Sequence, residues 1–233
     1  MTSKFLAVSV TLALATATAG HANVIFTDSF EFPVTENWNV YDLVGDYSSI
    51  PTDDSSGWKN TVGSGIEIQT NPTLSFIDAH HGNQYVELDS DRNNGGTSSE
   101  TNSSMTRTVD LARGYYELVW YYFPRTNNDG DDNLIEVFLD GASQELGTNL
   151  VDSANLRRDG SVTDWVRMSS TFFVDGTDNL YGLTFSAGGE QNTLGGFVDS
   201  VSLAAIPLSA SILFLGSALG VVSVSGWRRQ RTA

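Results

Sequence analysis

The sequence contains no cysteine and only five prolines among its 233 residues. The absence of cysteine excludes a disulfide framework and a cysteine nucleophile. Scarce proline and plentiful aromatic residues argue against disorder over the whole chain. Basic residues are also few, since 12 Lys and Arg stand against 28 Asp and Glu, a formal net charge of −16 at pH 7. An acidic surface of this kind repels nucleic acid and favours neutral ligands or divalent cations. Alternatively, the charge only keeps the protein soluble.

The first 22 residues have the three parts of a cleavable signal peptide. Lys4 supplies a positive start, residues 5–15 form an apolar run, and Gly20-His21-Ala22 places small residues at a cleavage site, with Ala17–Ala19 as an alternative. The apolar run is too short for a membrane anchor, because spanning a bilayer takes roughly 20 residues. We therefore predict that the rest of the chain is exported.

A second apolar segment lies at the other end of the chain. Residues 208–226 carry no charge, are long enough to cross a bilayer as a helix, and are followed by Trp227 and an arginine cluster. Arginines at a membrane boundary stay on the cytoplasmic side. Both ends therefore predict one topology, with a signal peptide at 1–22, an external domain at 23–206 and a membrane tail at 207–233.

This tail resembles a PEP-CTERM sorting signal of Gram-negative bacteria in its order of proline motif, apolar helix and arginines. Residues 205–211, Ala-Ile-Pro-Leu-Ser-Ala-Ser, are most similar to the variant Val-Pro-Leu-Pro-Ala, with Ser209 in place of the second proline. The resemblance implies that an exosortase-like membrane enzyme recognises the motif, removes the tail and leaves the protein at the cell surface or outside the cell. A plain single-pass anchor is the alternative. The residues that carry the resemblance are Pro207, Leu208, Arg228 and Arg229.

Between the two ends, short alternating runs separated by Gly, Asn and Asp clusters predict strands and no long helix. Odd positions are apolar in Ile135–Leu139 and even positions in Tyr85–Leu88, whereas 114–123 is apolar on both faces, as in a central strand. Long surface loops are expected at 42–60 and 92–102. With roughly nine to eleven strands, we predict an all-β, two-sheet antiparallel jelly-roll sandwich.

The domain resembles galactose-binding-like jelly rolls, as found in carbohydrate-binding modules. Four stretches carry the resemblance: Asp28–Glu31, Gly82–Asp89, Ser104–Val109 and Gly195–Leu203. In the resembled domains, a Glu that ends the first strand and an Asp on the last strand hold a structural Ca²⁺ that ties the chain ends together. Glu31 and Asp199 match those two positions.

The residues themselves also point to a metal. Asp199 shares the alternation of Phe197, Val201 and Leu203, so it is expected to face inward, where a carboxylate is costly unless it is paired or binds a metal. Asp28 interrupts the apolar alternation of the first strand and is a further candidate. Because hard oxygen ligands suit Ca²⁺, we predict a calcium site formed by Glu31, Asp199 and Asp28. The alternative is that Asp199 caps backbone amides at a bulge.

Two other segments look like metal sites but have simpler interpretations. Residues 127–133, Asn-Asn-Asp-Gly-Asp-Asp-Asn, are similar to a calcium loop but lack the EF-hand spacing and its closing Glu, so a solvated turn is expected. His80 and His81 are adjacent on an extended chain and point apart. We expect them to lie in a loop and not to form a metal site.

Aromatic, carboxylate and guanidinium side chains recur at positions predicted to face solvent. Aromatic rings stack on the apolar faces of sugars while carboxylates and Arg bond the hydroxyls, so this mixture suits saccharides. The strand residues among them could form a binding site on one sheet face, and the loop residues could instead form a site at the edge of the sheet. Alternatively, these residues are scattered over the surface and form no site. The predicted ligand-binding residues are Trp58, His80, Tyr85, Glu87, Arg125, Asn127 and Trp165.

The sequence therefore predicts an exported, non-catalytic jelly roll that binds a polysaccharide or other glycan, with no role for nucleic acid. A structural adhesion or biofilm-matrix protein without a sugar site is the alternative. A secreted hydrolase is disfavoured, because Ser64 in Gly63-Ser64-Gly65 lacks the residues of a nucleophile elbow. The sequence holds so many pairs of acidic residues that the two carboxylates of a glycosidase cannot be identified without the distance between them.

Overall fold

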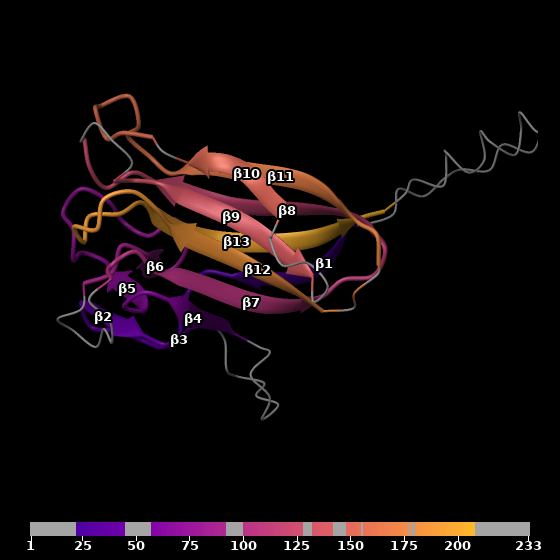
Figure 1. The fold of residues 1–233 in the computed structure, drawn as a ribbon. Coiled ribbons are helices and arrows are strands. Elements are labelled where there is room, and N and C mark those ends of the chain that lie inside the picture. Colours follow the sequence, from indigo (N-terminus) through magenta and orange to yellow (C-terminus); the bar gives the residue numbers. More distant parts are fainter. Residues whose placement is uncertain are drawn as a thin grey trace, which may run out of the picture. The chain divides into compact units, whose positions relative to one another are not determined.

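All the regular structure in the computed structural model is β-strand, arranged in two antiparallel sheets (Figure 1). The structure describes residues 22–44, 57–91, 100–127, 132–141, 148–154, 156–176, 178 and 180–207. It confirms the predicted all-β, two-sheet jelly-roll sandwich. The predicted tail helix at 208–226 and nearly all of the predicted signal peptide lie outside the described residues, within which no helix is long and apolar enough to cross a membrane.

The larger sheet has seven strands, in the order β11-β8-β13-β6-β5-β2, with β1 beside β13. Strand β13 pairs with β8 on one side and, on the other, with β6 over its first residues and with β1 over its last. Its strands are β1 (Asn23–Asp28), β2 (Trp38–Tyr41), β5 (Ile66–Thr70), β6 (Gln84–Glu87), β8 (Gly114–Phe123), β11 (Val166–Val174) and β13 (Phe197–Ile206).

The smaller sheet has six strands, in the order β10-β9-β12-β7-β4-β3. They are β3 (Leu43–Val44), β4 (Trp58–Val62), β7 (Ser104–Asp110), β9 (Ile135–Gly141), β10 (Thr148–Ala154) and β12 (Leu180–Ala187). The prediction of a surface loop over 42–60 was wrong at both ends of that range. Strands β3 and β4 lie there, because the Trp58 ring packs in the core and β4 pairs with β7.

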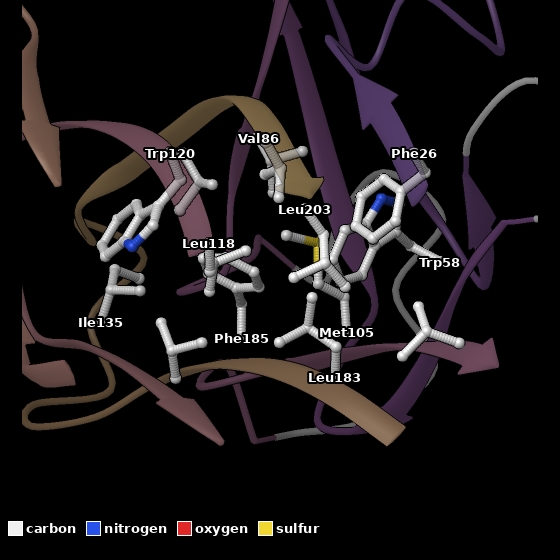
Figure 2. Packing of buried hydrophobic residues seen from close by; sticks show 14 of the residues in the cluster. Phe26, Trp58, Val86, Met105, Leu118, Trp120, Ile135, Leu183, Phe185 and Leu203 are labelled. Carbon is white, nitrogen blue, oxygen red and sulfur yellow. The ribbon is translucent and has the colours of Figure 1, made fainter. Parts of the chain in front are cut away.

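The core lies between the two sheets (Figure 2). Leu118 and Trp120 of β8 face Phe185 of β12 and Ile135 of β9 across it. The Phe185 ring meets the ring of Trp120 edge-on at 5.2 Å, and each such fully buried side chain contributes roughly 1.5–3 kcal/mol. The predicted inward positions of Ile135–Leu139 and of Val86 and Leu88 are confirmed by burial in this core.

A bulge in β13 changes which of its side chains face the core. The pairing with β8 shifts register between Asp199 and Ser202, and Ser200 has a φ of 50°. Because a bulge adds one residue to a strand, it reverses the alternation beyond it. Val201 and Leu203 lie in the sandwich core, whereas Phe197 lies in a separate cluster on the outer face. The expectation that Asp199 and Phe197 share the face of Val201 and Leu203 was therefore wrong.

Candidate functional site

The outer face of the seven-stranded sheet, turned away from the sandwich core, carries a second buried cluster. Its rings come from three strands, since Tyr85 lies on β6, Phe197 on β13 and Phe123 at the end of β8. Tyr85 and Phe197 meet edge-on, with ring centroids 5.0 Å apart. Strand alternation predicts that these side chains face solvent, but in the structure they are buried.

The cover over these rings is the segment between β5 and β6 together with the residues just before β11. Leu74 and Ile77 from the first and Trp165 from the second pack on the cluster. The Trp165 Nε1 donates a hydrogen bond to the carbonyl of Asp78 at 2.8 Å, which ties the two parts of the cover together. Tyr85 is consequently fully buried and offers no surface to a ligand.

A polar network continues the same face toward β5. Gln69 Nε2 donates to Glu67 Oε1 at 2.8 Å and to Glu87 Oε2 at 2.5 Å. Arg125 forms an ion pair with Glu87 and also donates to the carbonyl of Thr193 at 2.8 Å. Backbone amides complete the network, because Gly195 N donates to Glu87 and Asp91 N to Glu67. The network therefore joins three strand residues to three loops.

Two glutamates of this network lie directly opposite each other on β5 and β6. Burial raises the pKa of Glu67, although hydrogen bonds from Asp91 and Gln69 oppose the shift. Burial, and then the charge of Glu67, raises the pKa of Glu87 well above its usual value, whereas the Arg125 guanidinium lowers it. Like charges placed opposite one another destabilise a sheet, so Arg125 is the group that makes the pair tolerable.

The network reaches the surface in a groove beside Trp38 of β2. The groove encloses about 170 Å³ and is lined by Trp38, Leu74, Glu67, Gln69, Thr73, Asp91, Arg125 and Thr193. One large ring therefore borders a small hollow that offers amide, carboxylate, hydroxyl and guanidinium groups. It is smaller than the roughly 300–1,000 Å³ of pockets that take drug-sized ligands, so it has room only for a small polar group.

Four of the predicted ligand-binding residues meet on this face. Tyr85 belongs to the buried cluster, Glu87 to the polar network and Trp165 to the cover. Arg125 lines the groove. Only Arg125 among them borders the groove directly. Tyr85, Glu87 and Trp165 were predicted for a sheet face and Arg125 for a loop edge, and the structure brings the four together; Tyr85 and Glu87 are fully buried, which closes them to direct ligand contact.

The other three predicted residues do not line the groove, although the His80 ring meets Trp165 edge-on, with centroids 6.3 Å apart. Trp58, expected in a surface loop, is fully buried in the sandwich core, where its Nε1 donates to Asp28 at 3.1 Å. Asn127 is exposed and is not among the residues that line the groove. His80 stacks on Tyr121, and its Nδ1 lies 2.8 Å from the Ser200 hydroxyl. Burial lowers the pKa of His80, against the opposing charge of Asp164.

The three predicted calcium ligands all accept hydrogen bonds from N–H donors. Asp28 pairs with Arg107 at 3.2 Å, and Glu31 accepts from the amides of Asn83 and Gln84 at 2.8 and 2.9 Å. Asp199 caps the amides of His81 and Ser200 at the bulge, as in the alternative interpretation, and burial raises its pKa to about 7.

In the part of the chain that the structure describes, no three acidic or histidine side chains converge on one point. Glu31 and Asp199 do bind the same short segment, at residues 81–84. The calcium site of Glu31, Asp199 and Asp28 stays a prediction.

Of the groove's lining residues only Arg125 was predicted from the sequence, and the missed ones include Trp38, Glu67 and Gln69. The run Ile66-Glu67-Ile68-Gln69 alternates apolar and polar residues, which is the signal of a half-buried strand. It would have placed Glu67 and Gln69 on one face. Nothing local to Trp38 shows that its neighbour in space is β5, because that contact comes from the pairing of β2 with β5.

The sequence matches no known family profile and no curated protein. Solved structures with a similar backbone include the CBM22-1 xylan-binding domain from Paenibacillus barcinonensis, with 12% identity, a TM-score of 0.47, and coverage of 82% of this chain and 100% of that one. The K3 adhesin domain of Lys-gingipain from Porphyromonas gingivalis has 12% identity, a TM-score of 0.45, and coverage of 79% and 99%. Likeness at this level says nothing about what this chain binds.

Proposed function

We propose that this chain is an exported, non-catalytic carbohydrate-binding protein, and that the groove beside Trp38 holds the sugar. The observation that carries the proposal is the lining of that groove, in which one tryptophan ring borders a prearranged set of hydrogen-bonding groups. The ring supplies an apolar surface for the C–H face of a sugar, and the amide, carboxylate and guanidinium groups suit its hydroxyls.

The charge of the groove favours a neutral saccharide. Glu67 and Asp91 line it, and Glu87 lies just beneath, whereas Arg125 is the one basic residue among the groove's lining residues. An anionic polysaccharide would meet this acidic surface with like charge, and the chain as a whole is strongly acidic. A neutral extracellular polysaccharide, bound at one sugar unit, is the ligand class that fits.

Binding without hydrolysis is supported by the state of the two glutamates. Glycosidases need two carboxyl groups that flank the scissile bond and exchange protons with it. Here Gln69 Nε2 bonds to both Glu67 and Glu87, and Glu87 is fully buried beneath Arg125 and the Gly195 amide. A glycosidic bond has no route to a position between them.

Export and sorting form the second half of the proposal and depend on the sequence. The signal peptide at 1–22 sends the domain out, and the tail at 207–233 holds it briefly in the membrane until an exosortase-like enzyme acts at Pro207-Leu208. Intact-mass analysis of protein from the host cells is the test. We expect a chain that begins near Asn23 and lacks the tail; a full-length mass would contradict this.

Affinity electrophoresis against neutral plant and bacterial polysaccharides tests the sugar site. We expect retardation of the wild-type protein by at least one neutral polysaccharide and its loss in Trp38→Ala, because the stacking surface is removed. Tyr115→Ala is the matched control, since Tyr115 is an exposed ring on the same sheet that does not line the groove. Equal retardation of wild type and Trp38→Ala would contradict the proposed site.

A further inference from the structure

Asp89 has an oxygen that nothing in the described structure satisfies. The residue follows β6, and its side chain is fully buried. Its Oδ2 accepts hydrogen bonds from the amides of Asn192 and Leu194, at 3.2 and 2.9 Å. Its Oδ1 is buried and has no hydrogen-bond partner. A buried carboxylate oxygen without a donor is unfavourable, and in native proteins such groups mark an ion, a bound water or a functional strain.

A second oxygen of this kind lies opposite Asp89. Asn102 pairs with Asp89 in an isolated antiparallel bridge, so the two side chains emerge on the same side. Asn102 Nδ2 donates to the carbonyl of Gly189 at 3.0 Å, whereas its Oδ1 is buried without a partner. Both unsatisfied oxygens thus belong to side chains that bind the segment between β12 and β13. Two unsatisfied acceptor oxygens beside one segment are a place for a cation or a bound water.

The same segment brings a second carboxylate to the place. Asn192 Nδ2 donates to Asp132 Oδ1 at 3.1 Å, so one asparagine contacts both Asp89 and Asp132. Asp132 is 2% exposed, which contradicts the expectation of a solvated turn at this position. Gly195 lets the segment approach, since a Cβ there would lie 2.7 Å from the Asp89 Cβ. The nearby cation, Arg125, is committed to Glu87.

We propose that Asp89, Asn102 and Asp132 bind a calcium ion. Two carboxylates and an amide oxygen are hard ligands of the kind that Ca²⁺ takes, and its irregular coordination accepts backbone carbonyls and waters in the remaining positions. A divalent ion balances the two buried carboxylates and satisfies both orphan oxygens at once. The site differs from the predicted one at Glu31 and Asp199 in that an Asp89 oxygen and an Asn102 oxygen are buried there without a hydrogen-bond donor.

The site also has a structural consequence for the groove. Its ion ties the segment between β12 and β13 to the end of β6, and Thr193 in that segment both lines the groove and accepts from Arg125. Calcium at Asp89 therefore holds in place one side of the groove without touching its ligand.

Isothermal titration of the full chain with CaCl₂, after treatment with a chelator, tests the proposal. We expect the wild type to bind Ca²⁺, and Asp89→Asn and Asp132→Asn each to lose one calcium equivalent or at least tenfold in affinity. Asp199→Asn reports on the other predicted site, and Asp78→Asn, at an exposed carboxylate, is the control. Calcium binding by Asp89→Asn equal to that of the wild type, or no calcium binding by the wild type, overturns the proposal.

Thermal melting separates metal binding from a folding defect. Asn has the shape of Asp, so we expect Asp89→Asn to melt in EDTA at or above the wild-type temperature, because an uncompensated buried charge is gone. In Ca²⁺, the wild type is expected to gain melting temperature and Asp89→Asn to gain less. A variant that gains as much as the wild type would show that the Asp89 oxygen holds only a water.

Discussion

The two faces of the seven-stranded sheet are both buried around β6 and β13, but by different chemistry. On the inner face, Val86 and Val198 pack against the second sheet in an apolar core. On the outer face, their neighbours Tyr85, Glu87 and Phe197 lie under a loop and beside a polar network. The inner face gains its stability mainly from apolar contact, whereas the outer face also depends on an ion pair and a network of hydrogen bonds.

This difference separates stability from function in the molecule. An apolar core tolerates little change in volume and offers nothing for recognition. Buried polar networks cost free energy when any partner is missing, but they hold side chains in fixed orientations. Glu67, Gln69 and Arg125 are oriented this way at the point where the outer face opens beside Trp38. The groove is therefore the place where fixed polar groups meet solvent.

The largest expected effect is on the inner face. Phe185→Ala removes a fully buried ring that contacts Trp58 and Trp120. We expect the free energy of unfolding to fall by about 4 kcal/mol, as measured by urea denaturation, with saccharide binding retained in the molecules that stay folded. A loss below about 1 kcal/mol would mean that this face is not the main source of stability.

Breaking the ion pair on the outer face comes next. Arg125→Met leaves Glu87 buried without its guanidinium, so the free energy of unfolding at neutral pH is expected to fall by about 3 kcal/mol. Arg167→Met is the matched control, because Arg167 and Glu117 form an exposed pair on the same sheet; removing such a pair changes stability by less than about 1 kcal/mol. Equal losses of unfolding free energy in the two variants would contradict the expected difference between a buried and an exposed ion pair.

A smaller effect on stability is expected for the cover. Leu74 is half-buried and lines both the groove and the larger hollow of about 560 Å³ beside Trp165. Leu74→Ala should lower the free energy of unfolding by about 1 kcal/mol and join the two hollows. Titration with saccharides of increasing length should then show a greater gain for longer chains than for single sugars. An unchanged length dependence would show that Leu74 does not divide the two spaces.

The smallest expected effect is on pH dependence. Since burial raises the pKa of Glu67, the folded state binds its proton more tightly than the unfolded chain does. Its contribution to stability is therefore fully present below the unfolded pKa, about 4.3, and is lost as pH rises through the folded pKa. Glu67→Gln removes this decline, while the neighbouring Glu87, whose pKa is also raised by burial, remains as a second source of pH dependence. Urea denaturation from pH 4 to 8 should give a flatter curve for the variant than for the wild type; parallel curves would contradict the assignment.

Much of the inner face could be predicted from the sequence, because strand alternation is local. Ile135–Leu139 and Tyr85–Leu88 show which residues face the core without any knowledge of their partners. The bulge beside Asp199 entered the sequence analysis only as the alternative, since one added residue leaves no mark in composition, yet it reverses the side chains beyond it. The error at Trp58 has a related cause, because burial of that ring depends on pairing with a distant strand.

The site was predicted less completely because it depends on a loop. Tyr85, Glu87, Arg125 and Trp165 were chosen for chemistry that faces solvent, and they do gather on one face. Tyr85 is buried under residues 71–80 and Trp165, and Glu87 under Arg125 and the Gly195 amide, so their burial comes from long-range contacts with segments that have no regular period. Alternation gives the face of a side chain, but it does not show what later covers that face.

The central claim is that the outer face, at Trp38, binds saccharide. The most direct test is a titration of the ¹⁵N-labelled protein with the best neutral oligosaccharide, observed at the tryptophan indole N–H signals by NMR. The account predicts that the Trp38 signal moves in a saturable way while those of Trp58 and Trp120, in the core between the sheets, stay in place. Saturable binding that leaves the Trp38 signal unmoved would contradict it.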